Sequence, residues 1–225
     1  MTFNRAFKDI FGSELTEKGY KYSAKLGRFV KVKNDELIYS VGYRNIPAIY
    51  HNKKCFTITS GIRTVYFDGI NKCTFESTES DLQVFSSIPE WIEFAYDELD
   101  MYDVVKNSRS RVKELVLPVF DNVKDLESYI TFAKRNHIDV FHYSDRSAMD
   151  SLVLFLTDNH EDFEEQILRA SVNSDENFVR KCMYEYLIGP RDRVYNDKKL
   201  YKRALEEATR RKKENLETLH MLKAI

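Results

Sequence analysis

The first apolar residues of the chain recur at the spacing of one helix face, at Phe3, Phe7, Ile10, Phe11 and Leu15. This spacing predicts a helix over residues 3–18 with one strongly apolar side. Gly19 follows where helix ends favour glycine, because a residue without a Cβ adopts positive φ at no steric cost. We therefore expect the chain to begin with an amphipathic helix that covers another apolar surface.

Three segments then alternate apolar and polar side chains, as half-buried strands do: residues 29–33, 37–44 and 55–63. Asn34 and Asp35 supply the turn of a hairpin between the first two. Residues 64–67 could continue the third strand past a bulge, and residues 72–77 are read as a fourth. Consecutive strands with short turns predict an antiparallel sheet, one face of which the N-terminal helix would cover.

Beyond residue 87 the pattern changes to amphipathic helices. Ser87-Ile88-Pro89-Glu90 has the spacing of a capping box, and it predicts a helix whose apolar stripe is Trp91, Ile92, Ala95 and Leu99. Further helices are predicted over residues 108–117 (ending at Pro118), 122–135, 145–157, 160–172, 175–188 and 197–223. Residues 137–143 are ambiguous and could form a short strand.

The expected fold class is α+β, with an N-terminal antiparallel sheet covered by a helix and a C-terminal helical array after it. The sheet domain would span residues 1–136 and the helical region residues 137–225.

The last predicted helix has a charged middle. Leu200, Ala204 and Ala208 lie on one face and Leu216 and Leu219 resume it, but residues 209–215 contain no apolar side chain, so we expect this middle to face solvent. Glu206–Arg210 and Glu207–Arg211 have the favourable i,i+4 order, which suits a self-stabilised solvent helix. If the helix instead docks a partner, the candidate contacts are Arg210, Arg211, Lys212 and Lys213.

Charge is segregated along the 225 residues, although the net charge is only −1. Residues 1–72 carry 13 Lys/Arg and 6 Asp/Glu, whereas residues 73–105 carry nine acidic residues and no basic one. An acidic face binds basic partners quickly. Its candidate partner-binding residues are Glu90, Glu93, Asp97, Glu98, Asp100 and Asp103. The alternative is that neighbouring segments neutralise this charge in the fold.

Composition indicates a soluble protein with a packed core, since 43% of residues are hydrophobic, 13% are aromatic and the mean hydropathy is −0.50. Cys55, Cys73 and Cys182 form no CxxC pair, which favours reduced thiols and a cytoplasmic location. No apolar run approaches the roughly 20 residues of a membrane span.

Motifs of catalysis are not recognisable. The sequence has no Gly-x-Ser-x-Gly elbow and no glycine-rich phosphate loop. His160 and Glu164 share a helix face but are too few for zinc. His137, Asp139, His142 and Asp145 form a second cluster, which an extended segment would split between two faces. We therefore expect no enzymatic activity, no metal and no cofactor.

Basic and aromatic residues interleave in the predicted sheet, in a pattern typical of surfaces that bind nucleic acid. The basic residues are Arg28, Lys31, Lys33, Arg44, Lys53, Lys54 and Arg63, and the aromatic ones are Tyr39, Tyr43, Tyr50 and Tyr66. An isoelectric point near 6.5 argues against a general nucleic-acid binder.

The order of elements resembles a family of small bacterial α+β domains of uncharacterised function. The matching residues are Gly19-Tyr20-Lys21, Phe29, Val41, Phe56 to Gly61 and Trp91, within residues 3–135. The resemblance implies a fold and a context among toxin-immunity or defence-linked proteins, and it brings no catalytic residues. The expectation is a non-enzymatic, cytosolic, immunity- or adaptor-like protein that binds a protein partner through charged surfaces. The alternative is a nucleic-acid-binding or nucleic-acid-processing protein that uses the sheet face.

Overall fold

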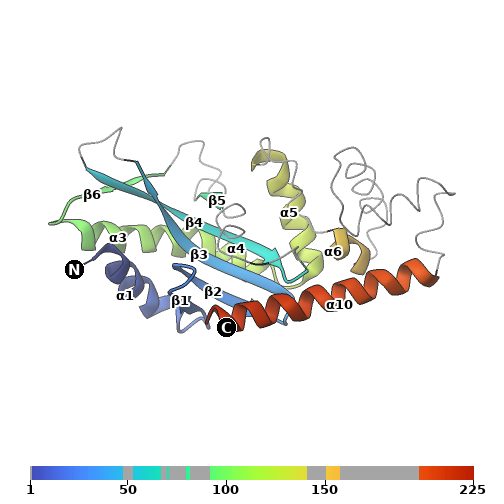
Figure 1. The fold of residues 1–225 in the computed structure, drawn as a ribbon. Coiled ribbons are helices and arrows are strands. Elements are labelled where there is room, and N and C mark those ends of the chain that lie inside the picture. The colour runs from blue at the N-terminus through green and yellow to red at the C-terminus, as the bar shows by residue number, and fades with distance from the viewer. Residues whose placement is uncertain are drawn as a thin grey trace.

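The computed structural model describes residues 2–47, 53–66, 70, 80–81, 92–140, 151–157 and 198–225. The chain has the α+β fold class expected from its sequence. An antiparallel sheet occupies the N-terminal part, and helices follow it (Figure 1).

Helix α1, Phe3–Leu15, confirms the predicted N-terminal helix and ends three residues earlier than expected. Its buried side chains are Ala6, Phe7, Ile10, Phe11 and Leu15. Gly19 has a φ of +84°, and the amide of Tyr20 donates to the carbonyl of Leu15 at 2.9 Å. A glycine in the left-handed region thus closes the helix, as the sequence indicated.

The sheet runs in the order β1-β2-β3-β4-β5, with β6 also paired to β4, and all pairs are antiparallel. The strands are β1 Lys21–Ser23, β2 Arg28–Lys33, β3 Leu37–Ile46, β4 Lys54–Thr64, β5 Ser80–Asp81 and β6 Phe94–Tyr96. The three alternating segments are confirmed as β2, β3 and β4. The predicted strand at 72–77 lies outside the described residues. The third segment ends at Thr64, and β1, β5 and β6 were not predicted.

The β2–β3 hairpin turns at Asn34 and Asp35, which have φ values of 55° and 52°. Asn and Asp tolerate the left-handed region better than other residues with a Cβ, and such turns match the twist of the flanking strands. The hairpin predicted from these two residues is confirmed.

One face of the sheet is covered by α1 and by α4, Leu117–Asn122, as Figure 1 shows. The rings of Phe3 and Phe56 lie 4.7 Å apart, and those of Tyr39 and Phe120 lie 5.4 Å apart. The hydroxyl of Tyr39 donates to the carbonyl of Val123 at 2.6 Å. The expected helical cover of the sheet is therefore present, and a second helix shares it.

The opposite face of the sheet is also largely buried, and it mixes polar side chains with the apolar Val30 and Ile38. Strand β4 is buried from Cys55 to Thr64, on both faces. Arg28 and Arg63 are 3% and 4% exposed, and a Cβ on Gly42 would lie 3.2 Å from the Cβ of Arg28. The glycine thus makes room for an arginine that lies flat against the sheet.

The helix predicted around Trp91 is wrong over residues 94–100. Phe94 pairs with Phe56 and their rings stack at 5.2 Å, so residues 94–96 form β6. Backbone pairing to β4 and ring packing override the local helical pattern. Residues 98–100 form a turn. Residues 87–91, with the capping-box motif, lie outside the described residues.

The helix expected to stop at Pro118 continues past it. Helix α3, Met101–Arg111, runs into a π-helical turn, Val112–Val116, and then into α4. Proline lacks the N–H of an α-helical bond and its ring crowds the carbonyl four residues earlier. The wider turn just before Pro118 accommodates both defects, so the helix is not broken.

The remaining described helices are α5 Leu126–Val140, α6 Ser151–Leu156 and α10 Lys198–Met221. They confirm the predicted helices at 122–135 and 197–223 and fall within that at 145–157. The helices expected at 160–172 and 175–188 lie outside the described residues. Residues 137–140 are helical, so a domain boundary at 136 falls inside α5.

One apolar cluster joins the sheet, α1, α5, α6 and α10, with Ala204, Ala208 and Leu219 among its members. None of the described helices combines the length and the apolar character needed to cross a bilayer.

Candidate functional site

The charged middle of α10 packs against the sheet region, contrary to the expectation that it faces solvent. Among residues 202 and 204–221 of this helix, whose burial the structure describes, the buried ones form one stripe: Ala204, Ala208, Arg211, Asn215 and Leu219. Their spacing of three or four residues is that of a single helix face. Arg211 and Asn215 are only 6% and 3% exposed, so the buried stripe runs through the segment that lacks apolar residues.

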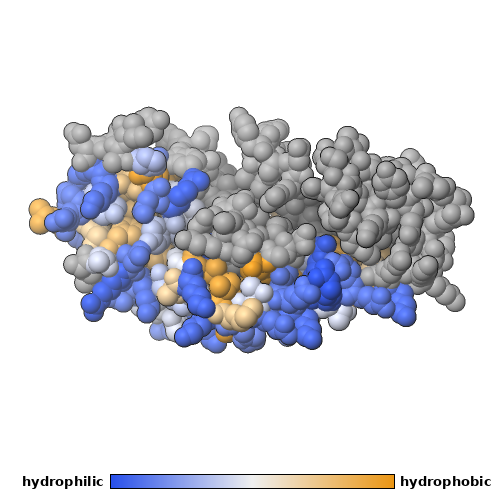
Figure 2. Space-filling model, in the orientation of Figure 1, coloured by the Kyte–Doolittle hydropathy of each residue, from blue (hydrophilic) through white to orange (hydrophobic). Residues whose placement is uncertain are grey.

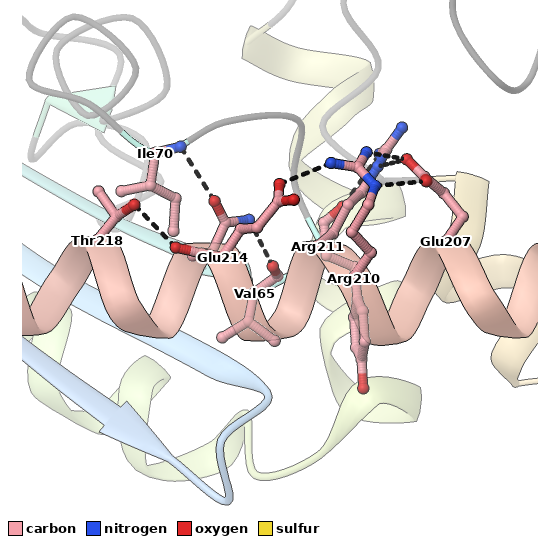
Figure 3. A network of polar contacts seen from close by, with 9 residues as sticks. Val65, Ile70, Glu207, Arg210, Arg211, Glu214 and Thr218 are labelled. Atoms are coloured by element: carbon pink, nitrogen blue, oxygen red, sulfur yellow. Dashed lines mark hydrogen bonds and ion pairs between the residues drawn. The ribbon is translucent and has the colours of Figure 1, made fainter.

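Arg211 and Asn215 bind backbone groups that follow β4, and Figure 3 labels Arg211, Val65 and Ile70 in this network. Arg211 Nη1 donates to the carbonyl of Tyr66 at 3.1 Å, and Asn215 Nδ2 donates to that of Val65 at 2.7 Å. The amide of Ile70 donates to Asn215 Oδ1 at 3.2 Å. Buried backbone groups that leave a sheet ladder need such partners. Arg211, a candidate partner contact, is therefore a structural contact inside the molecule.

Ion pairs run along the exposed side of α10. Arg210 binds both carboxylate oxygens of Glu207, at 2.6 and 2.9 Å, and Glu214 at 2.6 Å (Figure 3). Glu207 also accepts from Arg211 Nε at 2.9 Å, which confirms one predicted pair. Hydrogen bonds from Arg210, and then from Arg211, lower the pKa of Glu207. Glu206 pairs with Lys202 at 3.7 Å. The predicted pair of Glu206 with Arg210 is not formed.

Of the four candidate residues on α10, Arg210 and Arg211 thus have partners within the chain. Lys212 is half-buried and Lys213 is exposed. The end of the helix is fastened to the hairpin of β1 and β2. Ser23 Oγ donates to the carbonyl of Leu222 at 2.6 Å, and Lys25 Nζ to that of Met221 at 3.0 Å. The C-terminus accordingly lies beside β1 in Figure 1.

Four of the acidic candidates lie between the end of β6 and the first turn of α3, residues 97–103, which we call the β6–α3 corner. Asp97 Oδ1 accepts from the amides of Leu99 at 2.9 Å and Asp100 at 3.1 Å. Asp100 Oδ1 accepts from the amide of Asp97 at 2.7 Å. This reciprocal arrangement is that of a capping box, and it fixes the backbone that leads into α3.

Lys53, just before β4, clamps this turn from outside. Its Nζ lies 3.1 Å from Asp97 Oδ2 and 3.2 Å from Asp100 Oδ2. The amide of Asp100, followed by Lys53, lowers the pKa of Asp97, and the two carboxylates raise the pKa of Lys53. Asp97 and Asp100 are therefore paired with a lysine from the N-terminal part of the chain, as the alternative of charge neutralisation predicts, although one lysine balances only one of the two carboxylates.

The other acidic candidates lie around the corner. Glu93, Glu98 and Asp103 are exposed, and Glu90 lies outside the described residues. Asp97, Glu98, Asp100 and Asp103 thus lie together where the chain enters α3. The basic candidates on α10 are not part of this cluster.

Sequence reasoning missed the apolar part of the corner. Leu99 is 96% exposed and Tyr102 is 50% exposed. They rim a pocket of about 770 Å³, whose lining residues are Thr2, Phe3, Lys53, Lys54, Tyr96, Asp97, Glu98, Leu99, Met101 and Tyr102. Apolar and hydrophilic surface lie side by side at this end of the molecule (Figure 2). The Asp-x-x-Asp spacing of residues 97–100 was the available signal, because it resembles a capping box and places a helix start there.

Of the basic and aromatic residues considered for a nucleic-acid surface, Arg44, Lys53 and Lys54 are exposed. Arg28, Arg63, Tyr39 and Tyr66 are all buried. Burial raises the pKa of Tyr39 to about 12, with the charges of Asp125 and Asp121 adding to the effect. Arg28, Arg63, Tyr39 and Tyr66 therefore belong to the interior and cannot contact a nucleic-acid backbone, while nucleic-acid binding through the exposed residues stays a prediction.

Among the described residues, no three His, Cys, Asp or Glu side chains come together as ligands for one metal ion. His137 and Asp139 lie in α5, while His142, Asp145, His160 and Glu164 lie outside the described residues. Cys55 is a free, buried thiol whose pKa is raised by burial and then by Glu93. Cys73 and Cys182 also fall outside that part of the chain.

Comparison of the chain with protein-family models, with curated proteins and with solved structures gives no match in any of the three. The resemblance to bacterial toxin-immunity or defence-linked domains stays a prediction. Of the residues that carry it, Trp91 lies outside the described part, while Gly19, Phe29, Val41 and Phe56 occupy the end of α1 and the sheet.

Proposed function

We propose that the chain is a non-enzymatic binding protein that recognises a protein partner through the β6–α3 corner. One observation carries the proposal: Leu99 is 96% exposed at the rim of a pocket of about 770 Å³. A single exposed leucine is ordinary on a protein surface. Its position on a rigid turn, next to a half-exposed Tyr102 and a hollow, is what supports a docking role.

Rigidity of the turn lowers the cost of binding. Three backbone-to-carboxylate hydrogen bonds and the Lys53 clamp hold residues 97–100 in one conformation. A surface already in its bound shape loses little conformational entropy when a partner docks.

A protein fits the corner better than a small molecule, because the corner offers both a projection and a hollow. Leu99 projects and would enter a hollow on the partner, while the pocket beside it, with Phe3, Tyr96 and Met101 in its lining, would receive a side chain in return. Charged residues surround this apolar centre, which is the anatomy of protein interfaces. We propose that the protein acts in the cytoplasm as an immunity protein or adaptor does, by binding alone.

The test is capture of partners by the full chain from its native cells, after nuclease treatment, with wild type and Leu99→Asp in parallel. Met221→Asp is the matched control, because Met221 is 66% exposed and belongs to α10 instead of the corner. We expect the same protein with wild type and M221D, reduced at least about tenfold with L99D, which corresponds to the loss of one interface anchor. Equal recovery with L99D would contradict the proposal.

A further inference from the structure

The charge of the β6–α3 corner specifies the partner further, on the premise of the proposed function. Lys53 neutralises only one of the two carboxylates that it binds, Asp97 and Asp100. Glu98 lines the pocket, and Asp103 is exposed in the first turn of α3, four residues beyond Leu99. Lys54 is the other lysine of the pocket lining. Acidic groups therefore outnumber basic ones where the partner would lie.

The hollow is apolar and aromatic on its inner side. The ring of Phe3 lies 4.7 Å from that of Phe56 and 5.1 Å from that of Tyr96, so this wall is backed by the core. Met101 and Tyr102 continue the lining along the start of α3. Such a wall takes up an aliphatic or aromatic side chain and offers little to a polar one.

We propose that the occupant of this site is a short segment of the partner that carries an apolar side chain next to Lys or Arg. The apolar side chain fills the hollow beside Phe3 and Met101. The cation lies near Glu98 and Asp103, within reach of the half-exposed ring of Tyr102, which attracts cations through its face. The apolar contact supplies most of the affinity, and the exposed charges mainly set the choice of partner and the rate of association.

Phage display of random peptides on the immobilised full chain tests the inference without knowledge of the natural partner. We expect the enriched peptides to pair one large apolar residue with at least one Lys or Arg within a few positions. Binding of synthetic versions should weaken about fivefold or more as salt rises from low to high concentration, because exposed charges are screened. Amide shifts on titration should map to residues 97–103.

Charge reversal then separates the acidic residues from overall charge. Glu98→Lys with Asp103→Lys should reduce peptide binding about tenfold, whereas Glu127→Lys with Glu217→Lys should leave it unchanged. The control pair changes the net charge equally at two exposed positions on α5 and α10. Enrichment of acidic or uncharged peptides, binding that the first pair leaves intact, or no enrichment over Leu99→Asp would each overturn the inference.

Failure of this inference is distinguishable from failure of the proposed function. If capture from cells depends on Leu99 while peptide binding ignores Glu98 and Asp103, the corner is a docking site for a partner of other chemistry. If capture does not depend on Leu99, the proposed function itself is wrong.

Discussion

Two charged segments of this chain look alike in sequence and have opposite places in the fold. Residues 97–103 and residues 209–215 are both rich in ionisable side chains. The first forms the exposed β6–α3 corner, whereas the second turns Arg211 and Asn215 inward onto the backbone of Val65, Tyr66 and Ile70. Charge density therefore does not report exposure.

Helix periodicity separates the two segments where charge does not. Ala204, Ala208, Arg211, Asn215 and Leu219 form one stripe, and its two polar members meet backbone groups that need partners. In the corner, by contrast, carboxylates bind their own backbone and one lysine, which leaves Leu99 and Tyr102 outside. Truncation and substitution can test this division between a structural and a docking segment.

Removal of α10 should have the largest effect. A helix that projected into solvent would leave the sheet region unchanged when it is cut away. Because α10 buries Leu219 and satisfies polar groups after β4, deletion of residues 198–225 should cost about 5 kcal/mol or more. Chemical denaturation of the truncated chain measures this, and unfolding at the wild-type midpoint would show that α10 is dispensable.

Adjacent arginines on α10 give the sharpest comparison. Arg211→Met leaves Glu207 and the carbonyl of Tyr66 without this partner in the interior, and it should cost about 3 kcal/mol. Arg210→Met removes a more exposed arginine from its ion pairs, and it should cost less than about 1 kcal/mol. Equilibrium unfolding of both variants checks the difference. Equal losses would mean that the two faces of α10 are not distinct.

Asn215→Ala should rank next. It leaves the carbonyl of Val65 and the amide of Ile70 without their asparagine partner, at a cost of about 2 kcal/mol. Glu217→Ala is the control, because Glu217 is exposed two residues further along the same helix. Hydrogen exchange should show faster opening at Ile70 in N215A alone. Unchanged protection there would remove Asn215 from the structural role.

Much of the fold was predictable because its signals are local. Alternation marked β2, β3 and β4, and helical spacing marked α1 and α10. The features that the sequence did not predict depend on contacts between residues far apart in the chain. Strand β6 has only three residues and exists because Phe94 pairs with Phe56. The inward turn of Arg211 depends on a carbonyl 145 residues away.

Only the local part of the candidate site could be predicted from the sequence. The carboxylates of residues 97–103 are visible in the sequence, and they do lie together. Their neutralisation by Lys53 required the pairing of β4 with β6, which brings Lys53 to Asp100 across 47 residues of chain. The exposure of Leu99 follows from the same turn, since an apolar residue within a helical pattern is normally assigned to the buried face.

Acid should loosen the corner and leave the rest of the molecule folded, which is the smallest effect expected. The pKa of Asp97 is lowered in the folded state, chiefly by the amide of Asp100 and then by Lys53. A lowered pKa means that the contribution of this carboxylate is present above its unfolded pKa, near 4, and is lost as pH falls through the folded value. Amide exchange at Leu99 and Asp100 should therefore quicken below about pH 4 while far-UV circular dichroism stays constant.

Two variants show which carboxylate is responsible. Asp97→Asn should remove this local titration. Asp125→Asn is the control and should leave it in place, because the pKa of Asp125 is also lowered, by Ser128, but Asp125 lies outside the corner. Persistence of the titration in D97N would assign it to another group and would detach the rigidity of the corner from the Asp97–Lys53 pair.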